Sequence, residues 1–292
     1  MLFDAPGTCI MAIPSKGRLV QPTLKLLEEV GIKAQFYDER ALMLPTNWPG
    51  LNIIRVRPED IPYIVESGAA VMGITGLDYV VESQSKIEVV ERLGFGGGRI
   101  VIAVPSSSSI NDVNGIRDGM RIATKYVNLA RNYFEGLSKK VKIVKISGSA
   151  EIMPSLGVAD AIVDVMSTGT TLRLHGLKPI GVIMETEAAL IANGSRRNGC
   201  NDVMERFLVL LHGVKSSTNR KLILMNVPTE KLASVLSVLP SMEGPTVADI
   251  ANKPFKEVIS VVPENELPSL LVRLRNAGAK DILVMSIEKV IT

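Results

Sequence analysis

The chain has 292 residues, of which 46% are hydrophobic and 22% are charged, a balance that excludes an intrinsically disordered protein. This length suffices for two or three domains. A net charge of +3 without any block of five basic residues, together with an aromatic content of 4%, argues against a nucleic-acid-binding protein and suits small anionic ligands.

The sequence also indicates the cellular compartment in which we expect the protein. No run of about 20 apolar residues is present, so no membrane span is predicted. The first ten residues, MLFDAPGTCI, lack the basic region and the apolar stretch of a signal peptide. Cys9 and Cys200 lie far apart and show no metal-binding or redox spacing. We therefore expect a cytoplasmic protein with two unpaired thiols.

Up to residue 192, short apolar runs alternate with amphipathic segments. The predicted strands are Cys9–Ile13, Leu51–Val56, Ala70–Ile74, Ile100–Val104, Arg121–Thr124, Val141–Ile146, Ala161–Val165 and Ile180–Glu185. The predicted helices are Pro22–Val30, Pro58–Ser67, a segment after Gly76, Val127–Leu137, Ala150–Leu156 and Glu187–Ala192. This alternation predicts parallel βα units, whose ligand-binding loops follow the carboxyl ends of the strands.

The rest of the chain has a different pattern. A polar loop, Asn193–Asn201, precedes a long apolar helix from Asp202 to about His212, and Gly213–Arg220 reads as a polar linker. The predicted elements that follow are the strands Lys221–Val227, Thr246–Ile250, Glu257–Val262 and Asp281–Ile287 and the helices Thr229–Leu239 and Glu264–Ala277. Their order, βαββαβ, is typical of a ferredoxin-like unit. A core this small usually needs a neighbouring domain or oligomerisation for stability.

The segment DAIVDVMSTGTTL, which spans residues 160–172, places a carboxylate and a hydroxyl-rich loop at the end of a predicted strand. Backbone N–H groups and hydroxyls of the loop Ser167–Thr171 suit a phosphate. The Asp164 carboxylate just before it suits the hydroxyls of a sugar. A phosphate beside a diol indicates a ribose 5-phosphate. The alternative is a helix cap, for which serine and threonine are equally common.

Two further loops follow predicted strands. PSKGR, residues 14–18, places Lys16 and Arg18 beside a helix start, which suits a polyphosphate, although both cations could simply be solvated. GITGLD, residues 73–78, contains two glycines that let a backbone approach a ligand, but glycines are also ordinary turn residues. The glycine-rich segment Gly94–Gly98 is flexible enough to be a hinge between lobes. Neither histidine has a partner at ligand spacing, so no zinc site is predicted.

Taken together, these loops resemble one family, ATP phosphoribosyltransferase, the first enzyme of histidine biosynthesis. The segments that carry the resemblance are AIPSKGRL, GITGLDYV, IATKYVNLARNYF and GSAEIMPSLGVADAIVDVMSTGTTLRLHGLKPI, which occur in order between about Cys9 and Lys215. The tail Lys221–Thr292, with SMEGPTVADI and GAKDILVMSI, is similar to the regulatory domain of the family's long form. The short form lacks this domain and needs a separate regulatory subunit, so we expect none here.

The resemblance implies an α/β fold with three parts. Two lobes of the periplasmic-binding-protein type (type II) would form the catalytic region. Residues 1–95 and 185–215 would make the first lobe, and residues 96–184, which hold the phosphoribosyl diphosphate loop, would make the second. Residues 221–292 would form a C-terminal ferredoxin-like βαββαβ regulatory domain.

The resemblance also implies an activity and its ligands. The enzyme would be a Mg²⁺-dependent glycosyltransferase that joins N1 of ATP to C1 of phosphoribosyl diphosphate and releases diphosphate. Histidine would inhibit it by feedback, and the protein would be a homo-oligomer, a dimer or a hexamer. Neither nucleic acid nor a membrane is an expected partner.

The family's motifs assign candidate residues to each ligand, while the metal ligands stay unassigned. For phosphoribosyl diphosphate they are Glu151, Asp164, Ser167, Thr168, Gly169, Thr170 and Thr171. For ATP or the departing diphosphate they are Lys16, Gly17, Arg18, Gly73, Thr75, Gly76 and Asp78. For histidine they are Asn226 and Thr246, although the run Ala248–Ile250 after PTV departs from the family pattern.

Two other kinds of protein are rivals. A ligand-sensing protein with the same two-lobed fold would bind small anions without turnover, because a fold does not determine a function. A catalytically inactive relative could act as a regulatory subunit. The missing signal peptide argues against a secreted receptor, and a sensor has no need of a phosphate loop of this type. The intact loops SKGR and STGTT argue against the inactive relative.

Overall fold

The computed structural model describes residues 8–34, 42–194, 199–240 and 244–291. The chain divides into two compact units, Met1–Met204 and Glu205–Thr292. The first unit contains a six-stranded and a five-stranded sheet, and the second contains a four-stranded sheet. In the described part of the chain, no helix has the length and apolar character that crossing a bilayer requires.

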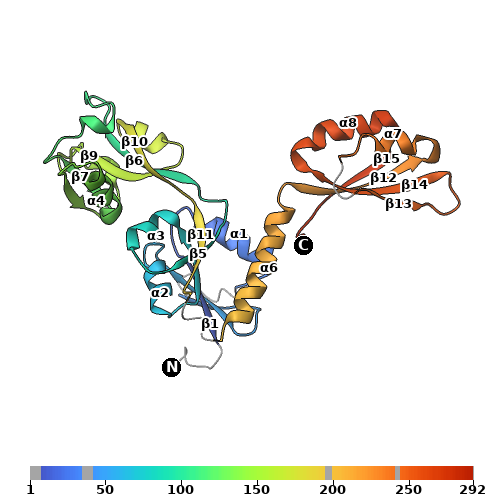
Figure 1. Cartoon of the computed structure of the whole chain (residues 1–292), viewed down its shortest axis with the longest axis horizontal. Coiled ribbons are helices and arrows are strands. Elements are labelled where there is room, and N and C mark those ends of the chain that lie inside the picture. Colours follow the sequence, from blue (N-terminus) through green and yellow to red (C-terminus); the bar gives the residue numbers. More distant parts are fainter. Residues whose placement is uncertain (1–7, 35–41, 195–198, 241–243, 292) are drawn as a thin grey trace. The chain divides into compact units, whose positions relative to one another are not determined.

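The six-stranded sheet forms the first lobe (Figure 1) and has the order β2-β3-β1-β4-β11-β5. Its strands are β1 (Cys9–Pro14), β2 (Met43–Pro45), β3 (Leu51–Val56), β4 (Met72–Gly76), β5 (Glu88–Arg92) and β11 (Ala188–Ala192). The helices of this lobe are α1 (Val20–Val30), α2 (Ile61–Ser67) and α3 (Leu77–Ser83). Strand β1 runs parallel to both β3 and β4. The loops after these three strands therefore meet at one edge of the sheet.

The five-stranded sheet forms the second lobe and has the order β10-β6-β9-β7-β8. Its elements are β6 (Gly98–Pro105), β7 (Arg121–Thr124), β8 (Lys142–Lys145), β9 (Ala161–Met166), β10 (Leu177–Thr186), α4 (Val127–Gly136), α5 (Thr170–Leu174) and the short 3₁₀ turns Val113–Gly115 and Ala150–Ile152. Strand β7 runs parallel to β8 and β9. Buried side chains of β6, β7, β9 and α4, Phe134 among them, form its core together with Tyr126, the N-cap residue of α4.

Two crossings of the chain join the lobes, one from β5 to β6 and one from β10 to β11. They are hydrogen-bonded to each other: the amide of Leu93 donates to the Ala188 carbonyl and the amide of Ala188 donates to the Phe95 carbonyl, both at 2.9 Å. The predicted hinge Gly94–Gly98 lies in the first crossing up to Gly97, and Gly98 is the first residue of β6. The two-lobed α/β architecture that the sequence predicts is therefore confirmed.

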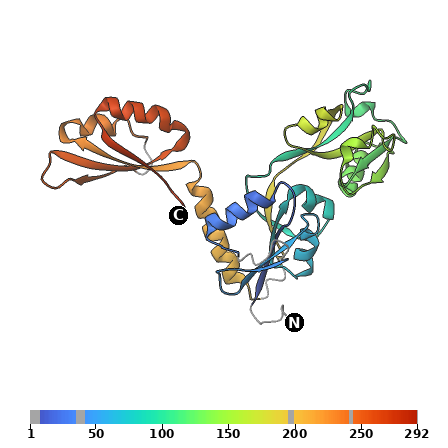
Figure 2. The same cartoon turned by 180° about the vertical axis from the view of Figure 1, so that it is seen from behind.

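The second unit begins within helix α6 (Asn201–Ser217) and continues as an antiparallel sheet of order β13-β14-β12-β15. Its elements are β12 (Arg220–Pro228), a 3₁₀ turn (Thr229–Lys231), α7 (Leu232–Leu236), β13 (Thr246–Asp249), β14 (Phe255–Pro263), a 3₁₀ turn (Glu264–Glu266), α8 (Leu267–Ala277) and β15 (Lys280–Ser286). Both helices lie on one face of the sheet (Figures 1 and 2), where Leu270 and Leu274 pack with Ile223 and Val258. The predicted βαββαβ unit is confirmed.

The predicted helix Glu187–Ala192 is wrong. Residues Ala188–Ala192 form strand β11, and all five are fully buried. The strand lies between β4 and β5 and pairs with both in antiparallel register. Burial on both faces removes the alternation that marks a strand, so its run of small apolar residues resembles a helix in the sequence.

The predicted linker Gly213–Arg220 is also wrong, because α6 continues through Ser217 and β12 begins at Arg220. The hydroxyl of Ser217 donates to the Val214 carbonyl at 2.8 Å, so this polar residue is satisfied inside the helix. The predicted helix Ala150–Leu156 is reduced to the 3₁₀ turn Ala150–Ile152. Residues 195–198 of the predicted loop Asn193–Asn201 lie outside the described residues.

The prediction of two unpaired thiols is wrong as well. Cys9 at the start of β1 and Cys200 just before α6 form a disulfide, with their Cα atoms 5.8 Å apart. Both residues are buried. The two cysteines are 191 residues apart in the sequence, and spacing along a chain does not reveal which residues meet in space.

We expect the substitution Cys200→Ser to lower the free energy of unfolding by about 4 kcal/mol, because the disulfide closes a very long loop in the unfolded chain. Denaturant titration of the variant and of the oxidised wild type measures this difference. Reduced wild type is the matched control, and its denaturant midpoint should equal that of the variant. Equal midpoints for the variant and the oxidised wild type would contradict the expectation.

Candidate functional site

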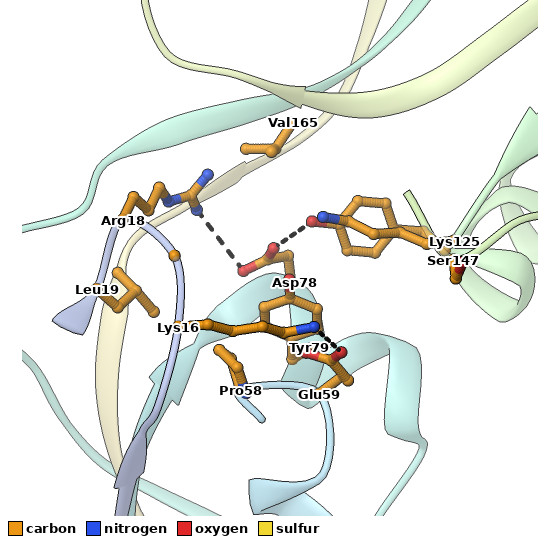
Figure 3. Close-up of a pocket in the computed structure, with 12 residues that line it drawn as sticks. Lys16, Arg18, Leu19, Pro58, Glu59, Asp78, Tyr79, Lys125, Ser147 and Val165 are labelled. Carbon is orange, nitrogen blue, oxygen red and sulfur yellow. Dashed lines mark hydrogen bonds and ion pairs between the residues drawn. The ribbon is translucent and has the colours of Figure 1, made fainter. Parts of the chain in front are cut away.

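A pocket of about 300 Å³ lies where loops of the first lobe face loops of the second (Figure 3). The first lobe contributes Lys16, Gly17, Arg18 and Leu19 after β1, Pro58 and Glu59 after β3, and Asp78 and Tyr79 from α3. The second lobe contributes Lys125 and Tyr126 after β7, Ser147 after β8 and Val165 of β9. Every one of these parallel strands approaches the pocket with its carboxyl end, as expected for an α/β ligand site.

The Asp78 carboxylate lies at the centre of this pocket and is 1% exposed. The hydroxyl of Tyr126 donates to Oδ2 at 2.6 Å, and the hydroxyl of Thr186 donates to Oδ1 at 2.8 Å. A guanidinium nitrogen of Arg18 lies 3.9 Å from Oδ1. Burial, followed by the Asp78 charge, raises the pKa of Tyr126 far above its usual value, so this phenol stays protonated and donates. Groups from both lobes therefore fix one buried carboxylate.

The start of helix α3 places Asp78 in this position. The N-cap residue is Gly76, which has no side chain to cap the helix. A Cβ at Gly76 would strike the Asp78 carboxylate, so only glycine leaves room for it. The hydroxyl of Thr186, at the end of β10, accepts a hydrogen bond from the backbone amide of Asp78 at 3.1 Å. It therefore takes the place of the missing side-chain cap.

The two cations of the loop after β1 have different surroundings. Arg18 is 28% exposed and points toward Asp78 (Figure 3). Lys16 is 53% exposed, and its Nζ lies 3.0 Å from the Glu59 carboxylate. Burial acts to raise the pKa of Glu59, but hydrogen bonds from its own backbone and from Lys16, together with nearby positive charge, lower it overall. Arg18 is therefore directed into the pocket, whereas Lys16 is held by a carboxylate at its side.

Lys125 links this pocket to the end of β9. Its Nζ lies 3.8 Å from Oδ1 of Asp164 and 4.9 Å from the ring centre of Tyr126, with the Tyr79 ring at 5.6 Å. Burial acts to lower the pKa of Lys125, but Tyr79 and Asp164 raise it overall, so the ammonium stays charged at neutral pH. Burial raises the pKa of Asp164, and Lys125 partly opposes this.

The hydroxyl-rich loop surrounds a smaller hollow of about 150 Å³. Its lining consists of Glu151 and the continuous run from Val165 to Leu172. Gly169 adopts a φ of 76° and starts helix α5, which only glycine does without strain. The hydroxyls of Thr168 and Thr170 are 3.1 Å apart. Since Val165 lines both this hollow and the larger pocket, the two spaces adjoin.

The structure brings most of the predicted site residues into these two spaces. Lys16, Gly17, Arg18 and Asp78 line the larger pocket, and Glu151 and Ser167–Thr171 line the hollow. Asp164 contacts Lys125 instead of lining the hollow. Gly73 is buried within β4, and Thr75 donates to the Pro58 carbonyl at 2.7 Å, so both support the walls of the pocket.

Other pocket residues were missed from the sequence. Lys125 and Tyr126 directly follow a predicted strand, which was a usable signal, and both belong to the quoted segment IATKYVNLARNYF. Glu59 and Tyr79 also line the pocket. The sequence around Thr186 gives no sign of a role in the pocket. Thr186 is 108 positions from Asp78 in the sequence, and only the fold brings the two residues together.

The two candidate histidine ligands do not converge. Asn226 on β12 donates to the Asp281 carboxylate at 2.9 Å, and Thr246 is exposed on the edge strand β13. Strand β14 lies between them. Among the described residues, no group of three histidine, cysteine, aspartate or glutamate side chains could hold a metal ion.

Comparison with known proteins gives consistent matches. Residues 57–213 match the family model described as ATP phosphoribosyltransferase, and residues 217–289 match the HisG C-terminal domain. An ATP phosphoribosyltransferase of Pyrobaculum calidifontis is 52% identical over 283 residues, which cover 97% of this chain and 100% of the relative. One from Sulfurisphaera tokodaii is also 52% identical, over 96% of this chain and 99% of the relative.

Among solved structures, one chain of the ATP phosphoribosyl transferase (HisG:HisZ) complex from Thermotoga maritima is similar, with a TM-score of 0.60 at 25% identity. The match covers 70% of this chain and 98% of that chain.

Proposed function

Because this chain belongs to the ATP phosphoribosyltransferase family, we propose that it joins N1 of the adenine of ATP to C1 of phosphoribosyl diphosphate and releases diphosphate. Family membership makes it a transferase of histidine biosynthesis. The observation that carries the proposal is the adjacency of two anion-suited spaces, the pocket around Arg18 and the hollow inside the hydroxyl-rich loop. Two anionic substrates need such neighbouring sites in order to react.

We place phosphoribosyl diphosphate at the loop. Hydroxyls and backbone N–H groups of Ser167–Thr171 would hold the 5-phosphate, and the carboxylates of Asp164 and Glu151 would accept hydrogen bonds from the ribose hydroxyls. ATP would occupy the larger pocket, where Arg18 offers a planar guanidinium to a phosphate group. Val165, shared by both spaces, would lie close to the point of transfer.

The proposed reaction is a single displacement at C1. The lone pair of N1 forms the new bond while the bond from C1 to the diphosphate oxygen breaks, with inversion at C1. The ribose ring carries positive charge in the transition state, as in glycoside hydrolysis. Orientation of the two substrates and stabilisation of the leaving anion then supply most of the acceleration. Lys125, charged, lining the larger pocket and 3.8 Å from Asp164, is suited to the departing diphosphate.

Mg²⁺ fits this site as an ion bound mainly by phosphate oxygens. The described residues offer no cluster of three metal-ligating side chains, and Mg²⁺ commonly binds through one or two carboxylates plus substrate phosphates. Glu151, which lines the hollow, is the carboxylate that we propose for it. When bound, the ion would neutralise the charge of the leaving diphosphate.

We further propose the domain roles that the sequence suggests. Residues 1–95 and 185–215 and residues 96–184 would be the two catalytic lobes, and residues 221–292 would bind histidine, with Asn226 and Thr246 as candidate contacts. The match of residues 217–289 to the family's C-terminal domain supports the last assignment. A homo-oligomer, a dimer or a hexamer, is the assembly that we propose.

We expect product formation from ATP, phosphoribosyl diphosphate and Mg²⁺, with pyrophosphatase present to remove diphosphate, and we expect added histidine to suppress it. The ultraviolet absorbance of the N1-ribosylated product follows the reaction. If product forms and histidine does not suppress it, the transferase activity is supported and the histidine assignment is contradicted. Binding of both substrates without product would favour a ligand-sensing protein.

A further inference from the structure

Helix α4 begins directly after the pocket residues Lys125 and Tyr126, and the side chain of its own N-cap residue does not cap it. The N-cap residue is Tyr126, which makes no side-chain cap hydrogen bond. The first amides of any helix have no partner within that helix. At this position the missing acceptor comes from the other lobe, from Glu82 near the end of α3.

Three hydrogen bonds join Glu82 to the first turn of α4. Its carboxylate oxygens accept the backbone amides of Asn128 at 3.1 Å and Leu129 at 3.0 Å. In return, the side-chain amide of Asn128 donates to the Glu82 carbonyl at 2.9 Å. Bonds from amides to an ionised carboxylate are about twice as strong as neutral ones, and a negative charge at a helix N-terminus is favourable.

The position of Glu82 on its helix connects this cap to the pocket. Glu82 follows Asp78 by four residues, so both side chains project from the same face of α3. The Asp78 carboxylate accepts a hydrogen bond from the Tyr126 hydroxyl at 2.6 Å. One turn further along α3, the Glu82 carboxylate accepts a hydrogen bond from the backbone amide of Asn128, just after Tyr126. The side chain of Tyr126 and the start of its helix are therefore fixed by one face of a helix from the opposite lobe.

The same contact bears on Lys125. This residue precedes Tyr126, and its ammonium must lie between Asp164 and the two tyrosine rings. A shift of the first turn of α4 would move Lys125 and Tyr126 together, away from the first lobe. Glu82 itself does not line the pocket, so it acts on the site through these residues.

We infer that Glu82 is a positioning residue of the substrate site, which caps α4 from the opposite lobe and thereby holds Lys125 and Tyr126 in place for ATP. This inference rests on the proposed function. If losing the cap lowers the fraction of protein in the binding-competent arrangement, the apparent dissociation constant of ATP rises in proportion. Saturating substrate restores that arrangement, so the turnover number changes less than KM.

The test uses Glu82→Ala and Glu82→Gln in the full chain, with the dissociation constant of ATP, kcat and KM as readouts. We expect Glu82→Ala to raise the dissociation constant and KM of ATP about tenfold while kcat stays within about threefold. Glu82→Gln keeps the shape and one acceptor oxygen, so its effect should be smaller. Glu29→Gln is the matched control, because this glutamate lies on α1, is 43% exposed and pairs with Lys25, and it should change nothing.

Hydrogen exchange at the amides of Asn128 and Leu129 tests the cap without any substrate. Protection of both amides should fall in Glu82→Ala and persist in the control. An unchanged ATP dissociation constant in Glu82→Ala, or a fall in kcat alone, would overturn the positioning role. The ATP dissociation constant and hydrogen exchange still test Glu82 if wild type binds ATP without turnover, an outcome that would refute only the proposed function.

Discussion

Replacement of Arg18 by alanine is expected to lower kcat/KM for ATP about a hundredfold, which corresponds to about 2.7 kcal/mol of transition-state stabilisation. The guanidinium points into the pocket and lies 3.9 Å from the Asp78 carboxylate. Its planar donors match the geometry of a phosphate group. Its removal also leaves the negative charge of Asp78 facing an anionic substrate, so the loss exceeds that of one hydrogen bond.

Lys16→Ala is the informative comparison for Arg18→Ala. Lys16 is 53% exposed and is already paired with Glu59, so we expect a loss of about fivefold or less. Arg18→Lys keeps the charge but removes the planar guanidinium. Its loss of kcat/KM should lie between those of Arg18→Ala and Lys16→Ala. Steady-state kinetics with varied ATP measures all three variants. Equal losses in Arg18→Ala and Lys16→Ala would show that ATP does not use Arg18 in the way we propose.

The local patterns that predicted this fold are those whose signal lies within one element. Strand β12 alternates partly exposed and buried residues from Leu222 to Val227, and its predicted range Lys221–Val227 agrees with Arg220–Pro228. The loop Ser167–Thr171 was found because small hydroxylated residues follow an apolar strand without a break. Local chemistry sufficed in both cases.

The features that were missed depend on contacts between distant segments. The run that forms strand β11 resembles a helix in the sequence, and its pairing with β4 on one edge and β5 on the other is a contact between distant segments. The disulfide of Cys9 joins residues 191 positions apart. Thr186 and Glu82 cap helices to which they are not adjacent in sequence, at separations of 108 and 46 positions. A helix whose N-cap lacks a suitable side chain is the one sequence signal for such a partner, and it does not identify the partner.

Asp164→Asn is expected to raise KM for phosphoribosyl diphosphate about tenfold to a hundredfold and to leave the protein folded at neutral pH. Burial raises the pKa of Asp164, so the folded protein binds its proton more tightly than the unfolded chain does. Its contribution to stability is therefore present at acid pH and is lost as the pH rises through the folded pKa. At neutral pH the ionised Asp164 carboxylate therefore lowers the free energy of unfolding. A charge that destabilises the fold favours a functional role for this residue.

The pH dependence provides the sharper test of Asp164. In wild type, kcat/KM for phosphoribosyl diphosphate should fall with acid, starting above the pKa of about 4 of an ordinary aspartate. Asp164→Asn should lose this acid limb. Lys125→Met removes the cation 3.8 Å away, which raises the pKa of Asp164 further and should move the limb to higher pH. An acid limb that persists unchanged in Asp164→Asn would belong to another group, and ribose binding by this carboxylate would have to be abandoned.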